Sequence, residues 1–115
     1  MENEKKLAES KLFTPYKLGS TTLRNRVIRS AAFESMGKDF APTQALKDYH
    51  VSVAKGGVGM TTVAYASINR SGISFNKQLW LRDEIVPALR DLTDAVHNEG
   101  AAVGIQLGHC GNMTH

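Results

Sequence analysis

The feature of this sequence that most restricts its fold is a helix-then-strand unit that occurs twice. In the first unit, a helical pattern over residues 43–55 ends in two glycines and leads into the weakly polar run of residues 58–66. In the second, a helical pattern over residues 83–97 ends in Asn-Glu-Gly and leads into residues 101–107. Uninterrupted strands that alternate with helices are typical of parallel sheets. The chain is therefore predicted to be α/β with parallel strands.

Each helix carries its own boundary signals. Thr43 is a suitable N-cap for the first helix, and glycine after its last turn accepts a left-handed backbone. Asp83 is predicted to cap the second helix, with Pro87 in its first turn. The buried stripes follow from helical spacing. They are Leu46, Tyr49, Val53 and Ala54 in the first helix, and Ile85, Leu89, Leu92 and Val96 in the second.

The residues before the first helix predict a different arrangement. Residues 1–11 are polar and show no periodicity, which predicts a tail without regular structure. Residues 12–23 contain two short β-prone runs around Gly19-Ser20, which favours a hairpin. Residues 26–31 are a further strand candidate, and long loops are expected over 33–41 and 67–79. The predicted order is hairpin, strand, helix, strand, helix, strand.

Composition excludes several classes of protein. The 115 residues suit one domain, and 42% hydrophobic with 22% charged residues is a globular composition. The net charge is only +3 and the longest basic run is Lys5-Lys6, so nucleic acid is not an expected partner. No apolar stretch is long enough to span a bilayer, so a membrane is not expected either. The single Cys110 fits a reducing compartment, and we expect a cytoplasmic protein.

Parallel α/β folds gather their functional residues at the carboxyl ends of the strands. In this chain those ends are residues 30–33, 64–66 and 106–111. His109 and Cys110 fall in the last segment, but a metal site needs three or four convergent ligands. We therefore predict no metal site there.

Four segments in this order resemble the Old Yellow Enzyme family, the FMN-dependent NADH:flavin oxidoreductases. The last segment, Gln-Leu-Gly-His-Cys-Gly at residues 106–111, is the most specific. The others are residues 12–26, with Leu-Phe, Pro, Leu-Gly and Leu-Arg-Asn-Arg; residues 56–59, with Gly-Gly-Val-Gly; and residues 79–84, with Leu-Trp and Asp-Glu. Val96-His97 and Gly100-Ala101 precede the last segment. The resemblance covers nearly the whole chain.

The resemblance implies a TIM (β/α)8 barrel. Such a barrel takes about 250 residues. The chain would supply the N-terminal hairpin and the first three β/α units, with parallel strands. Residues 12–115 are then expected to be the N-terminal part of a single, truncated FMN-binding barrel domain. The phosphate-binding strands, the substrate-orienting His/Asn or His/His pair, the Tyr proton donor and any iron–sulfur cysteines would lie downstream.

The family also implies where a flavin would bind. Gln106 is expected to face the pyrimidine edge of the ring, whereas the residues alone favour an amide buried in the core. Ser30, Ala31, Ala32 and Phe33 would lie under the flavin, although Phe33 stands where the family has Thr or Cys. The alternative for Phe33 is a core ring. Tyr65 would either swing away or cover one flavin face, and no catalytic residue is assigned.

Other marked residues have a structural interpretation. Trp80 is expected to anchor a loop to the barrel, and Glu34 to be a salt-bridge partner rather than an active-site carboxylate. His109 is either flavin-proximal or structural.

The predicted activity is hydride transfer from NADH or NADPH through FMN to a small molecule with an activated alkene, by resemblance. The fragment alone is expected to be inactive, and a homo-oligomer is left open. The alternatives are a small non-catalytic α/β binding or assembly module, or an inactive gene remnant.

Overall fold

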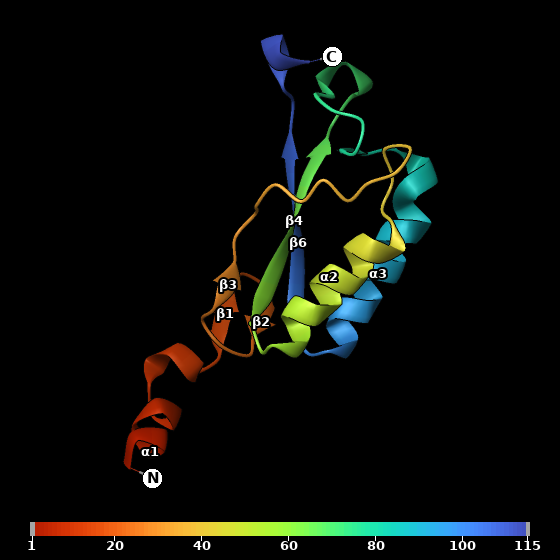
Figure 1. Cartoon of the computed structure of the whole chain (residues 1–115). Helices are drawn as coiled ribbons and strands as arrows, with labels where there is room; N and C mark the ends of the chain where they lie inside the picture. The colour runs from red at the N-terminus through yellow and green to blue at the C-terminus, as the bar shows by residue number, and fades with distance from the viewer. Residues whose placement is uncertain (1, 115) are drawn as a thin grey trace.

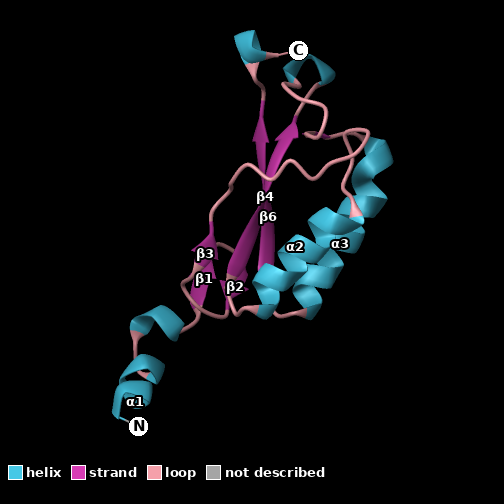
Figure 2. Cartoon of the chain, in the orientation of Figure 1, coloured by secondary structure: helices cyan, strands magenta, loops and turns pink. Residues whose placement is uncertain are grey.

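The computed structural model describes residues 2–114. Two helices, α2 and α3, lie side by side against one face of a parallel sheet, and a small hairpin lies near the amino ends of its strands (Figures 1 and 2). The elements are α1 (Glu2–Ala8), β1 (Tyr16–Leu18), β2 (Thr21–Leu23), β3 (Ile28–Arg29), α2 (Gln44–Lys55), β4 (Met60–Ser67), β5 (Leu79–Trp80), α3 (Val86–Asn98) and β6 (Ala102–Gly108). Short 3-10 turns occur at Lys11–Phe13, Arg70–Gly72, Asp83–Ile85 and Gly111–Met113.

Strand β4 is the centre of the sheet. It pairs in parallel with β6 along most of its length, from Met60 opposite Ala102 to Ser67 opposite Gly108. Because β6 takes one edge of β4, the two short strands share the other edge. β3 pairs near the start of β4, and β5 pairs near its end. The prediction of an α/β fold with parallel strands is confirmed.

Helix α2 begins and ends as its sequence signals predict. The Thr43 hydroxyl accepts a hydrogen bond from the Leu46 N–H at 3.2 Å, and Gly57 after the helix has a φ of +106°. Helix α3 differs at its start. Asp83 does not cap it but begins a 3-10 turn, and α3 follows from Val86 without a side-chain cap. The turn leads straight into the helix, so no capping position is left for Asp83.

The core lies between the sheet and the two helices. Ile85, Leu92 and Val96 are buried as predicted, together with Val63 and Ala66 of β4. The predicted stripe of α2 is partly wrong, because Tyr49 is 36% exposed whereas His50 is fully buried. Leu46, His50 and Ala54 recur every four residues and form the buried face. The sequence pattern misplaced the buried face of α2 because it counted only apolar residues as buried, and His50 is polar.

The N-terminal residues are more regular than expected. The tail predicted to lack structure contains helix α1, which extends away from the sheet (Figure 1). Glu, Lys, Leu and Ala are good helix formers, and lysines in the last turn interact favourably with the negative end of the helix dipole. The hairpin is confirmed, with Tyr16 opposite Leu23 and Gly19 at a φ of +60°. The next strand is shorter than its predicted range of 26–31, since only Ile28 and Arg29 pair.

The described helices include none with the length and apolar character needed to cross a membrane.

Candidate functional site

The carboxyl ends of β4 and β6 form one open hollow. It is lined by Tyr65, Gln106, Leu107, Gly108, His109 and Cys110. These residues meet because the two strands are parallel neighbours, with Ala66 paired to Leu107 after a register shift in β4. A Cβ added at Gly108 would meet no atom within 4 Å, so this edge is open. The structure thus brings together two of the three segments predicted from strand ends.

Gln106 presents its side chain to this hollow. The residue is exposed, and within residues 2–114 its amide group makes no hydrogen bond. The interpretation as an amide buried in the core is therefore wrong for the described chain. A side-chain amide offers one acceptor and two donors, and those of Gln106 are available to a ligand.

Tyr65 is held at its hydroxyl rather than free in the hollow. The Ser74 hydroxyl donates to Oε1 of Gln78 at 3.3 Å, so the Tyr65 hydroxyl donates to Ser74 Oγ at 3.1 Å. The Ser74 N–H also donates to Gln78 Oε1, at 2.8 Å. The peptide bond between Ala64 and Tyr65 is cis. The hydrogen bonds through Ser74 and Gln78 make the phenol ring a fixed wall of the site.

The third predicted segment reaches the same place through Phe33. Its ring is 67% exposed, so the alternative of a ring packed in the core is wrong. The Phe33 ring lies 4.8 Å from that of Phe75 and 6.5 Å from that of Tyr65, measured between centroids. Ser30, Ala31 and Ala32 precede it without regular structure, beyond the short strand β3. An aromatic cluster therefore borders the hollow that Gln106 lines.

His109 links the two loops that follow the strands. Its Nδ1 accepts from the Gly111 N–H at 3.0 Å, so in the neutral ring Nε2 carries the proton and lies 3.0 Å from Ser71 Oγ. A Cβ added at Gly72 would fall 2.6 Å from the ring of His109. Cys110 is half-buried, and its N–H donates to the Gly72 carbonyl. These contacts join the loop after β6 to the loop after β4, while His109 also lines the hollow, so its flavin-proximal or structural role stays a prediction.

Glu34 is the salt-bridge partner that the sequence favoured. Its side chain is only 2% exposed and lies 2.8 Å from Arg29 Nη1 and 2.6 Å from His50 Nε2. Its other oxygen accepts from the Ala64 N–H at 2.9 Å. Nδ1 of His50 lies 2.8 Å from Thr61 Oγ1. Sequence reasoning missed His50 and Thr61, because neither belongs to a motif.

Motif residues at the amino ends of the strands bind the backbone. The Arg24 guanidinium donates to the carbonyls of Ala54, Val58 and Glu99 at 2.6–3.0 Å. Asn25 donates to the Gly57 carbonyl at 2.6 Å. At the opposite end of the sheet, where Trp80 pairs with Ser67 at the end of β4, the Trp80 N–H donates to the Phe40 carbonyl, and Arg82 stacks 4.7 Å over the Trp80 ring. Arg82 also donates to the Phe40 and Asp39 carbonyls, so Trp80 and Arg82 together border the loop before α2; that the Trp80 ring anchors this loop to a barrel stays a prediction.

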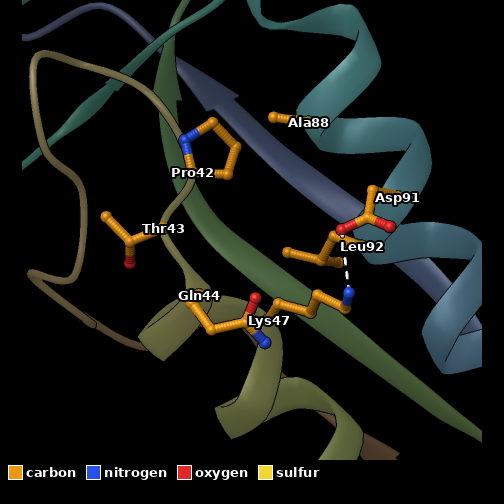
Figure 3. A pocket seen from close by; sticks show the side chains of 7 residues that line it. All are labelled: Pro42, Thr43, Gln44, Lys47, Ala88, Asp91 and Leu92. Carbon is orange, nitrogen blue, oxygen red and sulfur yellow. Dashed lines mark hydrogen bonds and ion pairs between the residues drawn. The ribbon is translucent and has the colours of Figure 1, made fainter.

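A second cavity lies between the start of α2 and helix α3, away from the strand ends (Figure 3). Lys47 crosses it to form a 2.9 Å ion pair with Asp91. The remaining lining is Pro42, Thr43, Gln44, Ala88 and Leu92. Its only charged groups neutralise each other, so this cavity offers a ligand little.

The fold matches the beginning of a flavin-enzyme barrel. The crystal structure of Old Yellow Enzyme from Pichia sp. AKU4542 superposes with a TM-score of 0.86 at 22% identity, over 94% of this chain and 28% of that one. This likeness shows the fold class. The model of the NADH:flavin oxidoreductase / NADH oxidase family matches residues 11–115, and the chain belongs to that family. The number of barrel units in the chain stays a prediction.

Two curated relatives place the chain further. It is 43% identical over 100 residues to 4,4'-dithiodibutanoate disulfide reductase of Rhodococcus erythropolis, over 87% of this chain and 25% of that protein. It is 40% identical over 106 residues to NADPH dehydrogenase of Listeria welshimeri, over 89% of this chain and 31% of that protein. The chain thus spans between a quarter and a third of these two relatives. The cofactor of the family is FMN, with NADH or NADPH as the reductant.

Proposed function

We propose that the carboxyl edge of β4 and β6 is the shelf on which this protein holds the isoalloxazine ring of FMN. The observation that carries the proposal is the exposed amide of Gln106, which lacks a hydrogen-bond partner in residues 2–114 and lines one hollow with Tyr65. A flavin has a flat apolar body and a polar pyrimidine edge of alternating donors and acceptors. An unpaired amide beside aromatic walls fits both parts.

Each proposed residue has a separate task. The Gln106 amide binds the N3–H and O2 edge, and the backbone of residues 30–33 lies under the ring, where Ala31 and Ala32 permit close approach. Tyr65 closes one side, with its hydroxyl held by Ser74. Phe33 has no hydrogen-bond donor, so it shields the ring from water and does not tune it by hydrogen bonding. Bound FMN supplies hydride transfer from a reduced nicotinamide to an acceptor.

We further propose an activated alkene, such as an α,β-unsaturated carbonyl compound, as the acceptor. None of the described residues is assigned the proton donor or the phosphate site. Residues 1–115 alone are therefore expected to hold FMN weakly and to turn over slowly. Residues 1–115 taken alone are expected to self-associate, because β6 pairs only with β4 among the described residues and an unpaired strand edge recruits other chains. A cytoplasmic location is part of the proposal, since a lone cysteine suits a reducing compartment.

The test is FMN titration of the protein expressed from its complete reading frame. Gln106→Leu removes the amide, and a lost hydrogen bond to a buried polar edge costs about 1–3 kcal/mol. We expect FMN affinity to fall roughly tenfold to a hundredfold, with the melting temperature of the apo-protein unchanged. Gln44→Leu is the matched control, because Gln44 is exposed on α2 and bonds only to Asp48.

Other outcomes of these titrations would contradict the proposed flavin site. A destabilised apo-protein with unchanged FMN affinity would show that Gln106 is structural. Absence of FMN binding in the unaltered protein would favour the non-catalytic binding module or the inactive remnant. Titration of residues 1–115 alone completes the comparison, since tight, stoichiometric FMN with NADH turnover would contradict the weak binding proposed for this segment.

A further inference from the structure

We propose that Glu34 is a positioning residue that locks the two flavin-facing segments of the chain to each other. This inference rests on the proposed flavin shelf and assigns it a support that lies behind it. Glu34 directly follows Phe33 in the chain, and its carboxylate accepts the N–H of Ala64, which directly precedes Tyr65. One carboxylate therefore joins the segment that follows β3 to the backbone of β4, one residue before Tyr65.

The carboxylate is itself held from two other directions. Arg29 reaches Glu34 Oε2 from β3 at 2.8 Å, and His50 reaches the same oxygen from α2 at 2.6 Å. Arg29 also donates to the Thr62 carbonyl of β4 at 2.8 Å and to the Tyr49 hydroxyl at 3.1 Å. The groups that surround Glu34 thus come from three elements, β3, α2 and β4.

The energetics argue that this cluster is not there for stability. Removing two charges from water costs several kcal/mol per ion, and apolar residues of similar volume often replace a buried ion pair without loss. The side chains of Glu34 and its cationic partner Arg29 are only 2% and 16% exposed, so much of this cost applies to the pair. What an ionic cluster adds over an apolar one is direction, because each bond fixes one atom. Here the fixed atom is the backbone nitrogen before Tyr65.

Tyr65 is held independently at its far end. Its hydroxyl bonds to Ser74, which bonds to the buried Gln78. Glu34 sets the backbone of this residue, and the Ser74–Gln78 pair sets its ring. Loss of Glu34 would therefore tilt the phenol wall about a fixed hydroxyl without detaching it. A tilted Tyr65 ring would change the surroundings of a flavin bound beside it.

The experiment compares Glu34→Ala and Glu34→Gln in the protein from its complete reading frame. Alanine removes every bond, whereas glutamine keeps an acceptor for the Ala64 N–H and loses the charge. We expect amide hydrogen exchange at Ala64 in the apo-protein to accelerate in the alanine variant and to recover partly in the glutamine variant. With saturating FMN, the visible flavin spectrum should shift in the same order. kcat should fall up to about a hundredfold in the alanine variant and less in the glutamine variant, since small misplacements carry such costs.

Controls separate positioning from mere support of the fold. Asp91→Asn removes the exposed ion pair with Lys47 and should alter none of these readouts. If the Glu34 variants only lower the melting temperature, with Ala64 exchange, flavin spectrum and kcat unchanged, the proposal is overturned. Thr61→Val, which removes only the hydroxyl beside His50, is the milder probe should both Glu34 variants fail to fold; unchanged exchange at Ala64 in it would also overturn the proposal. Failure of the flavin shelf itself is distinguishable, because the unaltered protein would then bind no FMN.

Discussion

The two ends of the parallel sheet are built on opposite rules. At the amino end, short glycine turns follow the helices, and Arg24 and Asn25 bind the backbone carbonyls of those turns. At the carboxyl end, the loops are long, Phe33 is 67% exposed and the Gln106 amide has no partner within residues 2–114. Barrels of this kind keep stability at one end and chemistry at the other. At the amino end, therefore, polar side chains bind the backbone and hold the fold, whereas at the carboxyl end the Gln106 amide has no partner among the described residues, as the proposed flavin site requires.

The largest effect should come from adding a methyl group at the amino end. A Cβ at Gly59 would fall 2.4 Å from the Asn25 carbonyl oxygen, and this oxygen belongs to backbone that cannot move aside. Gly59→Ala should lower the free energy of unfolding by about 3 kcal/mol or more, by overpacking. Gly108→Ala at the carboxyl end, with nothing within 4 Å, should change it by less than about 1 kcal/mol.

Denaturant unfolding of both glycine variants measures this contrast directly. Equal losses for Gly59→Ala and Gly108→Ala would show that the two ends are packed alike and would break the comparison.

A second contrast uses two arginines two residues apart. Arg24→Ala removes three hydrogen bonds, to the carbonyls of Ala54 in α2, Val58 before β4 and Glu99 after α3, at a cost of about 2–3 kcal/mol for partly exposed bonds. Arg26→Ala loses only a cation–π contact with the Tyr16 ring, worth about 0.5–1 kcal/mol at an exposed site. Thermal unfolding should rank the variants in that order. The FMN affinity of the folded protein should be the same in both, and a weaker affinity in Arg24→Ala would contradict the division between the two ends.

The smallest effect on stability is expected at the exposed aromatic cluster. Phe33→Ala should cost less than about 1 kcal/mol, since most of this ring already faces water. Its effect should appear instead as a severalfold loss of FMN affinity. Phe13→Ala, at a ring that is 47% exposed near the hairpin, should cost similar stability and leave FMN affinity unchanged. Calorimetry measures the stability of the two variants, and titration measures their FMN affinity. Equal FMN affinities would show that Phe33 does not contact the flavin.

The amino acid pattern sufficed for the elements whose signals are local. Thr43 marks the start of α2 and Gly57 follows its end, as predicted. The ends of β4 and β6 lie within two residues of their predicted positions. These predictions succeed because capping and apolar runs act within a few residues. Two predictions failed where the local signal was absent or ambiguous. Helix α1 was missed because a polar helix has no apolar stripe. Asp83 was wrongly predicted as the cap of α3 because it begins a 3-10 turn instead.

The location of the candidate site could be predicted from the sequence, but most of its contacts could not. Strand-end logic located Tyr65 and Gln106 correctly in one hollow. It gave no sign that Glu34 would meet His50, because these residues come together only when the chain folds across sixteen positions. A buried histidine on a helix face looks like an exposed polar residue in sequence. Only the paired carboxylate shows why it is inside.

The most direct test of the flavin shelf is the side-chain amide resonance of Gln106 in nitrogen-15 spectra as FMN is added to the apo-protein from its complete reading frame. We predict that the Gln106 amide signals shift on FMN binding, while those of Gln44 on the surface of α2 stay in place. If FMN binds and the Gln106 signals do not move, the carboxyl edge of β4 and β6 is not where the flavin pyrimidine is held.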